Sequence, residues 1–178
     1  GKMYGARANA ANFSMEELAW VMGYCRKYGV RVYVTVNTLI FDDEFDELFA
    51  YVDQLVDLHV DALILQDTGV AVALRQRYPD LPLHASTQMH LHNVKQVEWA
   101  KRLGFTRVVA ARETPLHIVE AMAKTGMEIE TFVHGALCVS YSGQCLMSSV
   151  IGGRSGNRGE CAQPCRLPYT LVEEKQGK

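Results

Sequence analysis

The sequence predicts an α/β protein with a parallel sheet, curved as in a TIM-type (β/α) barrel. Short apolar segments alternate with helical segments along residues 1–134. Strands that recur at intervals of roughly 20 to 30 residues with helices between them run parallel. The glycine-rich phosphate turn of a Rossmann fold follows none of these strands, so we favour the barrel over a doubly wound sheet.

The first helix and strand carry clear local signals. Ser14 and Glu17 form a capping box in front of the first helix, which we expect to stop at Gly29. Residues 30–37 alternate β-branched residues with others, as a strand does. In this strand the valines fall on one face, whereas Tyr33, Thr35 and Asn37 fall on the other.

The same unit then repeats along the chain. Three helices end in a cation followed closely by a glycine, at Gly29, Gly104 and Gly126, and a glycine there is free to adopt positive φ. For the helix after the fourth of these strands we expect Thr114 as the cap and Pro115 as the first residue. We expect helices at 42–57, 70–78 and 94–103, the last capped by Asn93, and strands at 62–66, 83–86, 107–111 and 128–133.

These strands are too few for a closed barrel of eight. We therefore expect a fragment of a longer protein, with residues 1–134 forming a partial barrel. We expect residues 135–178 to form a cysteine-rich, glycine-rich lobe packed on the barrel mouth, within the same domain.

The composition is that of an ordinary globular domain. The 178 residues are 48% hydrophobic and 21% charged, and the formal net charge of -2 provides no overall attraction to nucleic acid. We see no apolar signal segment or membrane-spanning run. Five cysteines then fit a reducing compartment, and we predict a cytoplasmic protein that does not associate with membranes.

Four of the five cysteines lie in the polar lobe, where the sequence indicates loop structure. Cys138, Cys145, Cys161 and Cys165 could be buried thiols, disulfides or ligands of a metal centre. The polar surroundings and the predicted compartment favour a metal centre. Only Cys161 and Cys165 have the close spacing of a zinc site. The wider spacing of Cys138 and Cys145 suits an iron–sulfur cluster, so we favour a cluster and keep zinc as the alternative.

Two blocks of this lobe carry a family resemblance. The first resembles the signature of the collagenase-like peptidases, peptidase family U32, at Glu130, Phe132, Gly135, Ala136, Leu137, Cys138, Gly143, Cys145, Met147 and Ser148. Residues 157–166 are similar to the second cysteine block of that family, and the segments GARANAANFS, YVTVNT and HASTQM extend the likeness over nearly the whole chain.

The resemblance implies two kinds of activity. The family name refers to proteolysis, including collagen degradation. Better-understood relatives use a [4Fe-4S] cluster to hydroxylate tRNA, ribosomal RNA or a quinone precursor without oxygen, with prephenate as the implied hydroxyl source in the RNA branch. In some relatives the fourth thiolate lies beyond the second cysteine block, so the role of Cys165 stays open.

Polar side chains end most of the predicted strands, where parallel barrels place their active sites. Our candidate catalytic residues are Arg112, His134, Asn37, Gln88 and Glu113. Arg112 is the strongest of them, because a guanidinium binds a carboxylate or phosphate through two hydrogen bonds. Gln66, Asp67 and Thr87 also lie at strand ends. Such residues commonly form turns or caps, Asp67 could cap the next helix, and Glu113 could merely begin one.

Further candidates lie in loops. Arg154, Arg158 and Arg166 could bind an anionic substrate or an RNA phosphate, or be solvated. His90 and His92 could bind a metal, although we expect them to lead into the Asn93 cap.

Peptidase motifs are missing from the sequence: it contains neither H-E-x-x-H nor G-x-S-x-G. A Cys138–His134 nucleophile pair would compete with Cys138 as a cluster ligand.

Taken together, these features predict an iron–sulfur enzyme that hydroxylates RNA without oxygen, with RNA and a small prephenate-like carboxylate as partners. The alternatives are a peptidase acting on peptides and a non-catalytic, metal-stabilised module.

Overall fold

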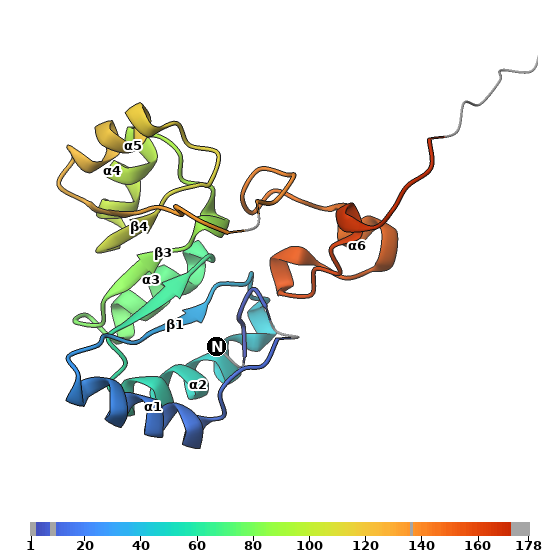
Figure 1. Cartoon of the computed structure of the whole chain (residues 1–178). Helices are drawn as coiled ribbons and strands as arrows, with labels where there is room; N and C mark the ends of the chain where they lie inside the picture. The colour runs from blue at the N-terminus through green and yellow to red at the C-terminus, as the bar shows by residue number, and fades with distance from the viewer. Residues whose placement is uncertain (1–2, 8–9, 136, 172–178) are drawn as a thin grey trace, which may run out of the picture.

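The computed structural model describes residues 3–7, 10–135 and 137–171. Helices and strands alternate up to residue 130, and the described residues from 137 to 171 form a lobe beside them (Figure 1). The strands are β1 Tyr33–Val36, β2 Ala62–Leu65, β3 Leu83–Ala85, β4 Arg107–Val109 and β5 Glu128–Glu130. The α-helices are α1 Met15–Lys27, α2 Phe45–Asp57, α3 Thr68–Arg77, α4 Val94–Arg102, α5 Leu116–Ala123 and α6 Met147–Gly152. Single 3₁₀ turns are η1 Asp42–Glu44, η2 Thr87–Met89, η3 Gly156–Arg158 and η4 Pro164–Arg166.

The five strands form one parallel sheet in the order β1-β2-β3-β4-β5, which confirms the predicted α/β class. Each strand lies beside the next one in the chain, so every crossover advances in the same direction. Right-handed crossovers of this kind place their helices on the same face of a sheet. Figure 1 shows the helices following one another along the sheet, from α1 and α2 at one end to α4 and α5 at the other. This order is compatible with a barrel.

The hydrophobic core lies between these helices and the sheet. Helix α2 supplies Leu48, Val52 and Leu55, each without exposed surface, at the spacing of one helical face. Leu63 of β2 and Val108 of β4 are equally buried. Each such side chain contributes about 1.5 to 3 kcal/mol. The core therefore fixes the sheet that carries the strand ends.

The predicted starts of α1 and α4 are confirmed, whereas α3 begins at Thr68 rather than at Val70. Ser14 and Glu17 form the capping box of α1, and the Asn93 side chain accepts a hydrogen bond from the backbone of Gln96 in α4. The second helical segment was expected to begin at Asp42, but a 3₁₀ turn precedes α2 there. Gly29, Gly104 and Gly126 all have positive φ, as predicted for the helix ends.

The prediction for the start of α5 was wrong by one residue. Pro115 has the extended backbone of a cap, and the helix begins at Leu116. The backbone N–H of Thr114 donates to the carbonyl of Ala111, so Thr114 belongs to the turn before the helix.

The other face of the sheet carries a charged cluster around Arg107. Its guanidinium is 2.6 Å from a Glu128 carboxylate oxygen and 3.1 Å from one of Glu130, and it lies over the Tyr33 ring. The Tyr33 ring also packs against His84, with centroids 4.7 Å apart. Burial, helped by the Arg107 charge, lowers the pKa of His84 to about 4. His84 is therefore neutral at pH 7.

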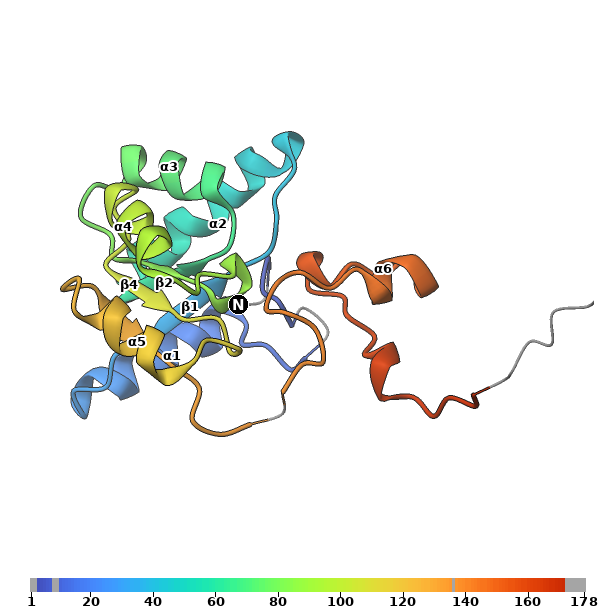
Figure 2. The same cartoon turned by 90° about the horizontal axis from the view of Figure 1, so that it is seen from above.

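The cysteine-rich lobe is less irregular than the sequence indicated. It contains α6 and the turns η3 and η4, and the left-handed conformation of Gly153 ends α6. Figures 1 and 2 show the lobe, in orange and red, to one side of the sheet and helices. Ala136 and the predicted end of the lobe at 172–178 lie outside the described residues.

Among the helices that the structure describes, none combines the length and the apolar character needed to cross a bilayer.

Candidate functional site

Two adjoining cavities lie where the strand ends meet the lobe. The mouth cavity, of about 860 Å³, is lined by polar residues that follow β1, β3, β4 and β5, by residues 5–7 and 10–12, and by the apolar residues Phe132, Val133 and Leu137. The cysteine cavity, of about 590 Å³, is lined mainly by the lobe. Arg7, Gln88 and Arg112 line both cavities and form their shared wall, together with Ala6 and Ala10.

The mouth cavity brings together four of the five candidate catalytic residues. Asn37 follows β1, Gln88 lies in η2 after β3, Arg112 follows β4, and His134 follows β5. Their convergence follows from the parallel sheet, whose strands all end at one edge. The fifth, Glu113, does not line either cavity.

Asn37 is held by the structure at both ends of its amide. Its Oδ1 accepts a 2.9 Å hydrogen bond from the backbone of Ala6, and its Nδ2 donates over 3.1 Å to the Ser86 hydroxyl. The side chain is only 8% exposed. Asn37 therefore fixes the segment that carries Arg7 against the end of β1.

Arg112 is bound to the lobe through Ser142. The Ser142 hydroxyl accepts hydrogen bonds from the backbone N–H of Arg112 over 3.1 Å and from its Nε over 3.2 Å. The same hydroxyl donates over 2.9 Å to Glu113, which also accepts from the Ser142 backbone. Ser142 has no exposed surface.

Glu113 is an ionised partner in this network. Partial burial alone would raise the pKa of Glu113, but hydrogen bonds from its own backbone and from Ser142, with the His90 ring beside it, leave that pKa below its usual value. His90 Nδ1 is 2.9 Å from Glu113 Oε1. The Glu113 carboxylate thus joins the loop after β3 to the lobe.

Gly143 places the lobe directly against η2. Its φ is +72°, and a Cβ built on it would lie 1.9 Å from the Gln88 carbonyl oxygen. A side chain at this position would collide with backbone, so the close approach requires glycine.

The four lobe cysteines line a single cavity. Cys138, Cys145, Cys161 and Cys165 are all free thiols, and each lines the cysteine cavity. Cys138 and Cys161 are exposed, whereas the other two are partly buried. Within residues 3–7, 10–135 and 137–171, no group of three or more His, Cys, Asp or Glu residues could hold a metal ion as arranged. The donors suit a thiolate-bound centre in type and number, and they surround a cavity rather than one point.

The three candidate arginines of the lobe have different surroundings. Arg158 pairs with Glu44 and donates to the carbonyl of Leu39. These contacts tie the lobe to the body, by which we mean the sheet and its helices up to residue 130. The hydrogen bond from Arg158 lowers the pKa of Glu44. Arg154 donates to the carbonyl of Glu160 within the lobe. Arg166 alone of the three lines the cysteine cavity.

The remaining strand-end and histidine candidates lie outside both cavities, apart from Thr87, which lines the mouth cavity. Asp67 caps α3 by accepting hydrogen bonds from the backbone of Gly69 and Val70, as the capping alternative predicted. Gln66 donates to Asn157 of the lobe. The His90 and His92 rings lie 4.6 Å apart in the loop before α4.

Sequence reasoning missed Arg7 and Ser142 as site residues. Both lie in segments that carried the family resemblance, but neither follows a strand end directly. Their place within these two segments was the only signal in the sequence that could have identified them.

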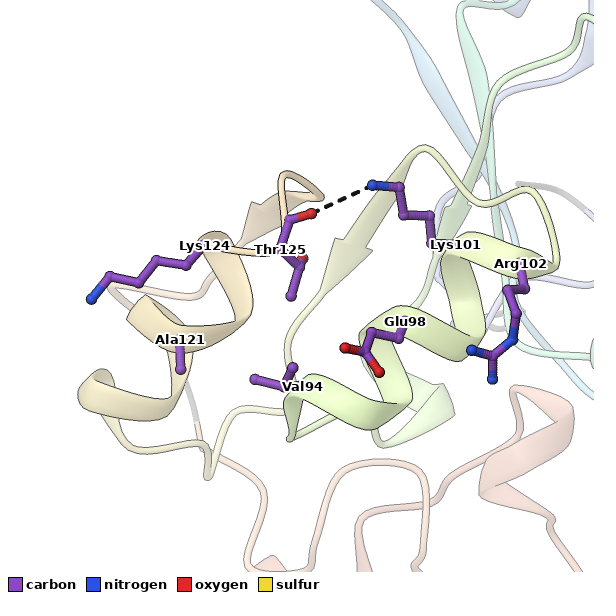
Figure 3. A pocket seen from close by; sticks show the side chains of 7 residues that line it. All are labelled: Val94, Glu98, Lys101, Arg102, Ala121, Lys124 and Thr125. Atoms are coloured by element: carbon purple, nitrogen blue, oxygen red, sulfur yellow. Dashed lines mark hydrogen bonds between the residues drawn. The ribbon is translucent and has the colours of Figure 1, made fainter.

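A third cavity lies between α4 and α5 (Figure 3). Figure 3 shows Lys101 reaching toward the carbonyl of Thr125, to which it donates over 3.4 Å. Other lining residues are Val94, Glu98, Arg102, Ala121 and Lys124. None of its residues lines the mouth or cysteine cavity, so we do not include it in the site.

The fold and the site define a parallel α/β protein with a thiol-lined cavity beside its strand ends. The chain belongs to peptidase family U32, whose sequence model matches residues 1–178. This agrees with the resemblance seen in the cysteine blocks.

Relatives in this family have names of two kinds. The chain is 43% identical over 176 residues to the 23S rRNA 5-hydroxycytidine C2501 synthase of Escherichia coli, covering 98% of this chain and 26% of that protein. It is 41% identical over 174 residues to tRNA hydroxylation protein P1 of Bacillus subtilis, covering 97% of this chain and 41% of that protein. It is 33% identical over 181 residues to a collagenase of Porphyromonas gingivalis, covering 95% of this chain and 43% of that protein. The chain thus spans less than half the length of these relatives.

A solved structure supports the fold. The U32 peptidase Mk0906 superposes with a TM-score of 0.57 at 19% identity, covering 66% of this chain and 51% of that one.

Proposed function

We propose that this chain is part of an enzyme that hydroxylates RNA without oxygen, using a [4Fe-4S] cluster bound by Cys138, Cys145, Cys161 and Cys165. The observation that carries the proposal is that the thiol-lined cavity shares a wall of two arginines and a glutamine with the mouth cavity. The names of the rRNA and tRNA relatives supply the reaction class. RNA substrates also favour a cytoplasmic location.

The barrel belongs to the same proposal. We propose that the five strands are an arc of a TIM-type barrel, with the lobe over its mouth. The sequential strand order and the likeness to a U32 structure support this.

The shared wall has the chemistry to bind a small carboxylate. Arg7 and Arg112 bring two guanidiniums, which suit a dicarboxylate such as prephenate. Gln88 adds an amide between the cavities, and His134 provides an exposed imidazole in the mouth cavity. When bound, the cluster would supply electron transfer beside this wall. The exposed lobe arginines Arg154 and Arg166 each donate one hydrogen bond to a lobe carbonyl, of Glu160 and Leu137 respectively, which leaves their other donors for RNA phosphates.

Metal analysis of anaerobically purified protein tests the cofactor. We expect a brown protein with about four irons and matching sulfide per chain. Cys145→Ala should lose most of the iron, whereas Cys25→Ala, which removes a free thiol of α1, should keep it. Colourless protein that contains stoichiometric zinc would contradict the proposal.

Peptide hydrolysis is the second candidate, favoured by the family and by the relative named as a collagenase. Cleavage of gelatin that survives chelation and Cys145→Ala, but is lost in His134→Ala, would establish it in place of hydroxylation.

A further inference from the structure

The hydroxyl of Ser142 uses its full hydrogen-bonding capacity on two neighbouring residues, Arg112 and Glu113. A hydroxyl has one proton to donate and two lone pairs to accept. The proton goes to Glu113 Oε2, and the lone pairs accept from the backbone N–H and the Nε of Arg112. Because Ser142 has no exposed surface, water does not compete for these bonds.

Glu113 sets the direction of these bonds. An ionised carboxylate only accepts hydrogen bonds, so the hydroxyl proton of Ser142 has to point toward it. Both lone pairs of Ser142 are then turned toward Arg112. The Ser142 backbone N–H donates to the other carboxylate oxygen over 3.0 Å, which fixes the carboxylate plane.

This arrangement leaves a defined part of Arg112 for ligands. The Nε–H is engaged by Ser142. Among the described residues, none accepts a hydrogen bond from the two η nitrogens of Arg112. Arg112 lines both the mouth cavity and the cysteine cavity. The two η nitrogens of one guanidinium match the two oxygens of a carboxylate.

We propose that Ser142 is a positioning residue that holds the Arg112 guanidinium so that its two η nitrogens bind a carboxylate group of the substrate. Ser142 lies between Cys138 and Cys145, so it also keeps this arginine in register with the thiol loop. The inference rests on the proposed function for its substrate class, but the hydrogen bonds that carry it do not depend on any reaction.

Equilibrium binding of prephenate to the full-length protein, purified anaerobically, tests the proposal. Ser142→Ala should weaken binding about ten- to hundredfold, because the arginine loses a hydrogen bond that involves a charged group. Iron content should stay within about twofold of the unmodified protein, since no thiol is removed. Ser148→Ala is the matched control: it removes a buried hydroxyl of the same lobe, bonded to the backbone of Ala162 rather than to an arginine. We expect this control to change binding by less than about threefold.

Glu113→Gln separates positioning from simple electrostatics. Removing a negative charge beside Arg112 should tighten anion binding if charge alone matters. The glutamine amide instead donates to the Ser142 hydroxyl and displaces the Nε–H of Arg112, so the proposal predicts weaker binding, by about fivefold or more. The variant keeps the size of the side chain, which limits its effect on folding.

A spectroscopic measurement tests the bond itself. In an NMR spectrum of protein with ¹⁵N-labelled arginine, the Nε–H signal of Arg112 is the one that disappears in Arg112→Lys. The hydrogen of this group should exchange slowly with solvent in the unmodified protein and fast in Ser142→Ala. The proposal would be overturned if Ser142→Ala left the prephenate affinity unchanged, or if Ser142→Ala and Ser148→Ala lost the same amount of affinity. Tighter prephenate binding in Glu113→Gln would also overturn it, as would fast hydrogen exchange of the Arg112 Nε–H in the unmodified protein. Unmodified protein that binds no prephenate would overturn its carboxylate part and the proposed substrate class. Binding that depends on Ser142 in a protein without hydroxylase activity would refute only the proposed function.

Discussion

Replacement of Gly143 by alanine tests whether the lobe is seated against the sheet end as the structure shows. Two costs add at this position. A non-glycine residue in the left-handed region costs about 1 to 2 kcal/mol. In addition, the new Cβ would lie 1.9 Å from the Gln88 carbonyl oxygen, whereas real Cβ contacts stay beyond 3.0 Å, so the loop has to move by about 1 Å or more. Overpacking of this kind costs a further 1 to 3 kcal/mol or so.

Gly153 offers a matched control in the same lobe. Its φ is +67°, close to that of Gly143, and an added Cβ meets nothing within 4 Å. Gly153→Ala should therefore lower the free energy of unfolding by about 1 to 2 kcal/mol, and Gly143→Ala by about 2 to 5 kcal/mol. Denaturant unfolding would give the two values, and iron analysis after anaerobic reconstitution should show a loss only in Gly143→Ala. Equal stability and equal iron content in the two variants would refute the reasoning.

Three further predictions concern contacts that hold the body and the lobe. Arg158→Ala leaves the partly buried Glu44 carboxylate without its guanidinium partner and should lower the free energy of unfolding, measured with denaturant, by roughly 1.5 to 3 kcal/mol. A decrease below about 0.5 kcal/mol would show that this pair does not hold the lobe. Because the pKa of His84 is lowered to about 4 in the folded protein, the unfolded chain binds the proton first. Stability should fall by at most about 3 kcal/mol as the pH drops from about 6.5 to 4, and His84→Asn should remove this part of the slope in urea titrations at each pH. An identical slope in both proteins would argue against a buried neutral imidazole. Asp67→Ala removes the cap of α3 and should lower stability by about 0.5 to 2 kcal/mol, and a thermal midpoint equal to that of the unmodified protein would exclude this role.

The sheet could be predicted from local signals because each of its elements is specified by nearby residues. The capping residues Ser14 and Asn93 each act within a few residues of their position in the chain. The strand-end candidates converge because parallel topology alone brings strand ends together. Helix α6 was missed because glycines and serines surround it, and it spans only Met147–Gly152.

The details of the site could not be read from the sequence, since they depend on contacts between distant residues. Glu113 was a candidate catalytic group because it follows the end of a predicted strand, yet the structure turns it to Ser142, 29 residues away. Asn37 was a candidate for the same reason, and both ends of its amide are bonded to other parts of the protein. A strand-end position predicts proximity to a site, but not which partner a polar side chain selects.

The contrast between sheet and lobe has a consequence for how the protein assembles. The sheet pairs each strand with its successor, so its loops close over short stretches of chain. The lobe is joined to the body by hydrogen bonds that span much longer stretches, 91 residues for Gln66 with Asn157 and 119 for Leu39 with Arg158. Long loops close at a greater entropic cost, so we expect the lobe to dock after the sheet has formed and to detach before the sheet unfolds. The thiols of the proposed cluster site would then come together only in the final docking step, and native-state hydrogen exchange should show the lobe opening independently of the core.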